Sequence, residues 1–196
     1  ATRYLESLGA RRIDLDVLAK NLYIPGSELV QRLADTFGWD ILDEMGCIRP
    51  AQLAARAFAS PEDTQRLNTI VHPAVLEQLS KMLLPAPCCS VYIPSVPLTV
   101  VEISAAASFT DAFGLADEVI AVTAPLEVRR VRAIERGMSP EDFDARTSVQ
   151  PSEDELCALA SCVIDNTAAD DSLYVKLDTW LEDHGIQLDG KGDARA

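Results

Sequence analysis

The spacing of apolar positions divides the chain into amphipathic helices and a few short apolar strands. Helices are predicted over residues 2–8, 17–22, 28–37, 51–58, 61–71, 73–84, 126–136 and 172–184, with two more beginning at 139 and 151, and strands over 11–15, 90–96, 119–122 and 162–165. Strands that alternate with helices predict an α/β fold. The run Val119–Val122 is apolar on both faces, which is typical of a parallel strand buried between helices.

One long interval, residues 27–84, shows no strand pattern and is predicted to be a helical insertion. The sheet-containing core then comprises residues 1–26 and 85–188. The polar, glycine-containing tail 189–196 is expected to be disordered. A chain of 196 residues is long enough for one full domain with such a subdomain.

The charge of the chain limits its partners. A net charge of −14 argues against nucleic acid or a membrane surface as the main partner. The basic residues nevertheless cluster at Arg129, Arg130, Arg132 and Arg136, and such a local cluster can bind an anionic small molecule in spite of the acidic total.

The cysteines and the hydropathy pattern suggest a compartment. The sequence has neither a signal peptide nor an apolar run of about 18 residues, which predicts a cytoplasmic protein. The five cysteines, odd in number, lack the paired spacing of a zinc site, and Cys88 and Cys89 are expected to be buried thiols. They are Cys47, Cys88, Cys89, Cys157 and Cys162.

Asp16 is the first candidate for chemistry, because it follows the predicted strand 11–15. Ligands of open α/β sheets collect beyond the carboxyl ends of the strands, where a carboxylate can accept a proton or hold a metal ion. The alternative is that Asp16 caps the helix that follows it. Asp14 is expected to be structural.

Ten short strings, in order along the chain, resemble the dephospho-coenzyme A kinase family. Together they run from the first residue to about His184, and Leu67-Asn68-x-Ile70-Val71-His72-Pro73 and Val163-Ile164-Asp165-Asn166 are the most specific. The others are Tyr4-Leu5-Glu6-x-Leu8-Gly9-Ala10, Ile13-Asp14-Leu15-Asp16, Tyr23-x-Pro25-Gly26-Ser27, Phe37-Gly38 with Ile41-Leu42, Val96-Pro97-Leu98, Val119-Ile120-x-Val122-Thr123-Ala124-Pro125, Arg136-Gly137-Met138-Ser139, and Ala145-Arg146 with Gln150.

The resemblance implies a P-loop kinase core, a helical substrate-binding insertion and a lid at about 136–151. It also implies transfer of the γ-phosphoryl of ATP, with Mg²⁺, to the ribose 3′-hydroxyl of dephospho-CoA. Asp16 would be the catalytic base, and Arg136 would be catalytic and contact ATP. His72 and Arg146 would bind substrate together with Asp16, and Asp165 and Asn166 would bind the nucleotide.

Each of these residues also has a structural interpretation. Arg129 is expected on a solvated helix face, and Arg136 could stabilise the carboxyl end of its helix. His72, which precedes a proline, could be a packed or capping histidine. Asp165 and Asn166 could form a simple turn after a strand.

The most diagnostic motif of P-loop kinases, G-x-x-x-x-G-K-[ST], does not occur in this sequence. We expect a strand and this loop to precede Ala1 in the intact protein. The lid pattern also departs from the family, since Arg136 is followed directly by Gly137 where the family usually has an intervening Asp. The alternatives are a kinase-like module that binds CoA without catalysis, and another small-molecule P-loop kinase.

Overall fold

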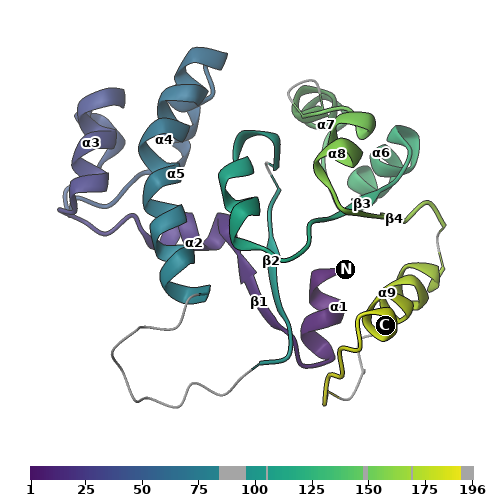
Figure 1. Ribbon diagram of the computed structural model, residues 1–196. Helices are drawn as coiled ribbons and strands as arrows, with labels where there is room; N and C mark the ends of the chain where they lie inside the picture. The colour runs from purple at the N-terminus through teal and green to yellow at the C-terminus, as the bar shows by residue number, and fades with distance from the viewer. Residues whose placement is uncertain (84–95, 105, 148–149, 169, 191–196) are drawn as a thin grey trace, which may run out of the picture. The chain divides into compact units, whose positions relative to one another are not determined.

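Helices and short strands alternate along the computed structural model, which describes residues 1–83, 96–104, 106–147, 150–168 and 170–190 (Figure 1). The helices are α1 (Thr2–Ser7), α2 (Leu15–Asn21), α3 (Glu28–Phe37), α4 (Pro50–Ala57), α5 (Pro61–Leu83), α6 (Leu126–Glu135), α7 (Pro140–Thr147), α8 (Glu153–Leu159) and α9 (Ser172–Asp183), with 3-10 turns η1 (Trp39–Ile41), η2 (Ala106–Ser108) and η3 (Thr110–Leu115). The strands are β1 (Arg11–Asp14), β2 (Thr99–Glu102), β3 (Ile120–Thr123) and β4 (Cys162–Asp165).

The chain divides into two units. The sheet-containing unit comprises Ala1–Ile13 and Ile93–Ala196, and the helical unit comprises Asp14–Tyr92. The division falls at Asp14 rather than after residue 26, because α2 packs against α5 of the helical unit.

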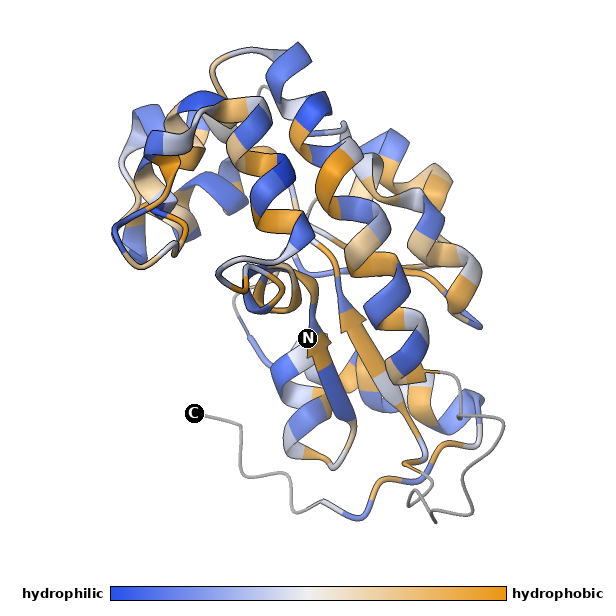
Figure 2. Ribbon diagram, turned by 90° about the vertical axis from the view of Figure 1, so that its left-hand side faces the viewer, coloured by the Kyte–Doolittle hydropathy of each residue, from blue (hydrophilic) through white to orange (hydrophobic). Residues whose placement is uncertain are grey.

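Local sequence signals explain the helical unit. Ser27 caps α3 by accepting a hydrogen bond from the amide of Val30, a contact worth about 1 kcal/mol. The buried face of α3 includes Leu33 and Phe37, and Figure 2 shows the alternation of apolar and polar residues along the helices. The unit is therefore built from amphipathic helices that share one apolar interior.

The prediction of two helices around Pro73 is wrong, because α5 continues through this residue. Proline removes one intrahelical hydrogen bond, which would ordinarily end or kink a helix. Here Val71 and Val75 are buried on either side of the proline, so packing anchors both halves of the helix in the apolar interior.

Two two-stranded sheets form the other unit: β1 pairs with β2, and β3 pairs in parallel with β4. The register places Ile120 opposite Cys162 and Thr123 opposite Asp165. β2 was not predicted from the sequence, and the predicted strand 90–96 lies almost wholly outside the described residues.

The expectation that both faces of the β3 segment are buried is wrong. Val122 of β3 is 41% exposed and Val163 of β4 is 47% exposed. A two-stranded sheet has too few neighbours to cover both of its faces. Val122 instead forms part of the wall of a pocket.

The core of this unit forms where α9 and α1 pack together with β4. Leu177 and Leu5 are almost fully buried there with Ile164, and the Tyr4 hydroxyl donates to Asp178 at 2.6 Å. Of the tail 189–196, the structure describes residues 189 and 190. The Gly190 amide donates a hydrogen bond to the carbonyl of Leu8 at 2.7 Å. Residues 191–196 lie outside the described residues.

Candidate active site

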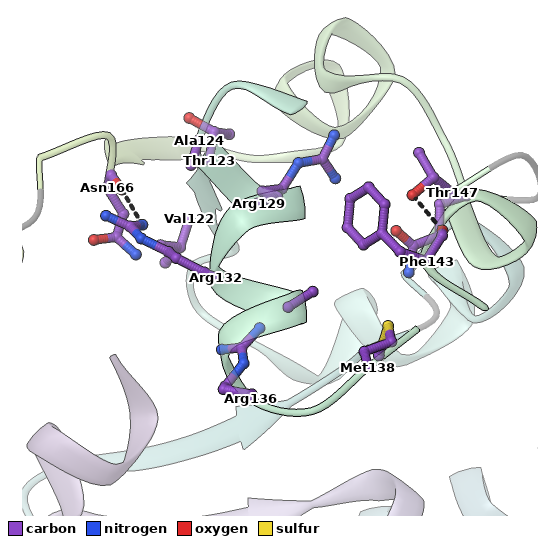
Figure 3. A pocket seen from close by; sticks show the side chains of 12 residues that line it. Val122, Thr123, Ala124, Arg129, Arg132, Arg136, Met138, Phe143, Thr147 and Asn166 are labelled. Carbon is purple, nitrogen blue, oxygen red and sulfur yellow. Dashed lines mark hydrogen bonds between the residues drawn. The ribbon is translucent and has the colours of Figure 1, made fainter. Parts of the chain in front are cut away.

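A pocket of about 340 Å³ lies at the carboxyl ends of β3 and β4 (Figure 3). The residues that line it come from β3 and the residue after it, from α6, from the turn after α6, from α7, from the segment that follows α7 and from the first residue after β4. They are Val122, Thr123, Ala124, Arg129, Arg132, Ala133, Arg136, Met138, Phe143, Thr147, Gln150 and Asn166. This edge of a parallel sheet is where α/β proteins bind ligands.

Three arginines of the pocket come from α6 and from the residue that ends it. Arg129, Arg132 and Arg136 are three and four residues apart, a spacing that brings side chains to the same side of a helix. Arg136 is the C-cap residue of α6. Gly137 follows it with a φ of +91°, a conformation that glycine adopts without strain. The helix therefore ends where the polypeptide turns toward α7.

The pocket is cationic. Among the described residues, its lining includes three arginines and no aspartate or glutamate. The neighbouring Arg130 is neutralised outside it, since its guanidinium donates to both carboxylate oxygens of Asp144 on α7 at 3.2 Å. This ion pair raises the pKa of Arg130 and joins α6 to α7. A protein of net charge −14 thus concentrates positive charge in one concavity.

Arg132 holds the backbone that follows β4. Its guanidinium donates to the carbonyl oxygens of Asn166 at 2.6 Å, Thr167 at 3.2 Å and Ala168 at 2.7 Å. The backbone segment that places Asn166 at the pocket is therefore held by a side chain of α6.

Arg129 does not lie on a solvated face, which corrects the expectation from sequence. The residue is half-buried and its Nε atom is buried without a hydrogen-bond partner among the described residues. Figure 3 shows its side chain extending from α6 toward the part of the pocket formed by Phe143 and Thr147.

Asp165 and Asn166 differ in their surroundings. The Asp165 carboxylate accepts hydrogen bonds from the Thr167 hydroxyl and from Lys176 Nζ at 3.0 Å, and these hydrogen bonds hold the pKa of Asp165 below its ordinary value. Its local role is that of a turn-stabilising carboxylate. Asn166 lines the pocket.

Asp16 lies exposed in the first turn of α2, in the helical unit. The cap of this helix is Asp14, whose Oδ1 accepts the amides of Asp16 and Val17 at 3.1 Å. The alternative that Asp16 is the cap is therefore wrong, and the structural role expected for Asp14 is confirmed. The strand ends at Asp14 and not at Leu15, because the helix begins there.

His72 lies half-buried in α5 of the same unit, and α5 contacts α2. The structure thus places the two predicted substrate-contacting residues of this unit, Asp16 and His72, on helices that pack together. Arg146 belongs to α7, and its side chain lies outside the described part of the chain, as do Cys88 and Cys89.

Several pocket residues were missed by sequence reasoning. Met138, Phe143 and Thr147 form the α7 side of the pocket, and Thr147 donates its hydroxyl to the Phe143 carbonyl at 2.9 Å. The one available signal was the predicted lid, 136–151, which contains all of them. No three His, Cys, Asp or Glu side chains gather as a metal site within the described residues. No described helix has the length and apolar character needed to cross a bilayer.

This protein has an α/β fold, and the described lining of its pocket at the ends of two parallel strands contains arginines and no carboxylates. Such a site is suited to binding phosphorylated small molecules. The family model for dephospho-CoA kinase matches residues 1–171. The chain is 35% identical over 172 residues to a dephospho-CoA kinase of Corynebacterium diphtheriae, covering 87% of this chain and 83% of that protein. The chain belongs to the dephospho-CoA kinase family.

Solved structures share this fold. The structure of TT1252 from Thermus thermophilus aligns with a TM-score of 0.69 and 29% identity, over 92% of this chain and 88% of that one. A dephospho-CoA kinase from Campylobacter jejuni aligns with a TM-score of 0.56 and 20% identity, over 93% and 91% of the two chains, which supports the fold. The prediction of an α/β kinase-like fold is confirmed.

Proposed function

We propose that the protein transfers the terminal phosphoryl group of ATP to the ribose 3′-hydroxyl of dephospho-CoA, which gives CoA. The observation that carries this proposal is the pocket at the ends of β3 and β4, whose described lining contains three arginines and no carboxylate. Phosphoryl transfer requires a protein to position the reactants and to stabilise negative charge, and such a pocket is suited to the second task. Membership of the family supplies the acceptor.

Asp16 is the proposed catalytic base. Its carboxylate is exposed on α2, so a substrate hydroxyl can reach it. It takes the proton of the 3′-hydroxyl as the oxygen of that group bonds to phosphorus and the bond to the leaving phosphate breaks. Because α2 packs on α5, His72 is a proposed contact of the same substrate.

Arg136 is the proposed charge-stabilising residue. It is exposed at the end of α6 and borders the pocket, so its guanidinium can stabilise the negative charge that develops on the phosphoryl oxygens. Arg146, on the adjacent α7, is a proposed substrate contact. Asn166 is proposed to contact the nucleotide directly, and Asp165 to act on it by holding the turn that follows β4.

Mg²⁺ is part of the proposal as the ion that, when bound with the nucleotide, neutralises charge on its phosphates. The lack of a three-ligand cluster among the described residues fits this role, because Mg²⁺ in kinases is held by one or two carboxylates together with phosphate oxygens and water. A cytoplasmic location is likewise proposed.

The test is a coupled assay on the intact protein with its natural N-terminus, in which dephospho-CoA and several nucleosides are compared as acceptors. We expect turnover with dephospho-CoA alone. Turnover with a nucleoside instead would assign the protein to another class of small-molecule kinase. Binding of CoA with no phosphoryl transfer to any acceptor would indicate a non-catalytic binding module.

A further inference from the structure

We infer that Arg129 is a further anion-binding residue of the pocket and contacts a phosphate or diphosphate group of the bound ligand. The inference rests on the proposed function only in that ATP and dephospho-CoA are the ligands that would bring phosphate groups to the pocket. Arg129 is distinct from Arg136 and Arg146, to which the family resemblance already gives a role.

The three arginines of α6 differ in their partners. Arg130 is paired with Asp144, and Arg132 is bound to three backbone carbonyls of residues 166–168. Arg129 has a buried Nε atom without a hydrogen-bond partner among the described residues. It is thus the one of the three whose guanidinium retains a buried donor available to a ligand.

Burial of an unpaired donor of a charged group is unfavourable, because water no longer solvates it and no protein atom replaces the water. A buried donor without a partner therefore calls for an explanation, and one explanation is that a ligand accepts its hydrogen bond in the bound state. Arg129 extends into a pocket rather than into the protein core (Figure 3). Arg129 therefore combines an unsatisfied buried donor with a side chain that lines the pocket.

The charge of the lining selects the kind of ligand. A carboxylate facing Arg129 would compete with an anion, and none of the described residues that line this pocket is an aspartate or glutamate. Arg132 and Arg136 also line the pocket and add to its positive potential. A planar guanidinium donates two parallel hydrogen bonds to a phosphate, which makes phosphoryl oxygens a well-matched partner.

The nucleotide and dephospho-CoA both carry phosphate groups, so the experiment separates them. Binding of tripolyphosphate, ATP, dephospho-CoA and adenosine is measured by titration calorimetry on the intact protein. The variants are Arg129→Gln, Arg129→Lys and, as the matched control, Arg130→Gln, which removes the same charge from the next residue but outside the pocket.

Arg129→Gln is expected to weaken tripolyphosphate binding by about tenfold, the loss that corresponds to one charge-assisted contact. Arg129→Lys is expected to recover part of that loss, and Arg130→Gln to remain within about twofold of the parent. Adenosine binding should be unchanged in all three. A parallel loss with ATP assigns the contact to the nucleotide, and a parallel loss with dephospho-CoA assigns it to the acceptor.

Equal affinities for tripolyphosphate in the parent and Arg129→Gln would overturn the inference. Equal losses of affinity in Arg129→Gln and Arg130→Gln would also overturn it, as would a parent protein that binds no polyphosphate. Thermal unfolding without ligand checks the fold, and the inference requires Arg129→Gln to unfold within a few degrees of the parent. Polyphosphate binding that depends on Arg129 in a protein that does not phosphorylate dephospho-CoA would support the inference and refute the proposed function.

Discussion

Arg132 Nη1 lies 2.6 Å from the carbonyl oxygen of Asn166, so a side chain of α6 holds the backbone that leaves β4. The two residues are 34 positions apart in the sequence. The contact joins the helix that carries the pocket's arginines to the turn that completes the pocket. It therefore links the stability of this unit to the shape of its ligand site.

Replacement of Arg132 should loosen this turn. Arg132→Met removes the three hydrogen bonds to residues 166–168, and we expect the free energy of unfolding to fall by about 1–3 kcal/mol because three carbonyls lose a charged donor. Urea denaturation gives the change. Hydrogen exchange should accelerate at the amides of the turn more than in α9, and uniform acceleration would contradict the proposed local role.

Asp16→Asn should remove turnover while leaving substrate binding. Without a carboxylate the 3′-hydroxyl loses its proton acceptor, and we expect kcat to fall by about 100-fold or more in the intact protein with little change in the Kd for dephospho-CoA. Asp14→Asn is the matched control, because asparagine caps helices as well as aspartate does. Retention of kcat within a few-fold in Asp16→Asn would exclude Asp16 as the base.

Asp165 should make stability depend on pH in the acid range. Hydrogen bonds from Thr167 and Lys176 lower the pKa of this carboxyl in the folded state, so its contribution is complete above the unfolded value of about 3.9 and is lost as pH falls through the folded value. The thermal midpoint of Asp165→Asn should thus lie below the parent near pH 6 and approach it near pH 3. The exposed Asp183→Asn provides the control, with a difference from the parent that is small throughout.

Gly190→Ala should destabilise the sheet-containing unit. A Cβ atom at Gly190 would overlap the carbonyl group of Leu8, to which Gly190 donates its amide. We expect a loss of about 1–3 kcal/mol in the free energy of unfolding, as in other overpacked sites. Gly114→Ala is the matched control, because nothing lies within 4 Å of a Cβ there. A comparable effect of both substitutions would show that the close approach is not the cause.

Elements with strong local signals were predicted closely from the sequence. The bounds of α3 and β4 agree with the structure, since a serine cap and Gly38 delimit the first and a short β-branched run defines the second. β2 escaped prediction because four residues carry little periodicity and depend on pairing with β1, which lies far away in sequence. Local patterns therefore determined the helices better than the sheets.

The candidate site shows the same limit. Asn166 and Arg136 were identified through their motifs, and the structure places both at one pocket. The burial of Arg129 could not be deduced, because it depends on the packing of α7 against α6. Likewise, nothing in the run Arg129–Arg132 indicates which arginine pairs with Asp144, since partners 14 or more residues away decide it.

The proline within α5 has a mechanical consequence. Because Pro73 has no amide hydrogen, α5 lacks the hydrogen bond from residue 73 to the carbonyl of Thr69. The two halves of the helix are therefore coupled more weakly at this point than elsewhere. The adjoining residue is His72, a proposed substrate contact. Flexing at this joint would let His72 follow an incoming substrate while Val71 and Val75 keep both halves anchored in the apolar interior.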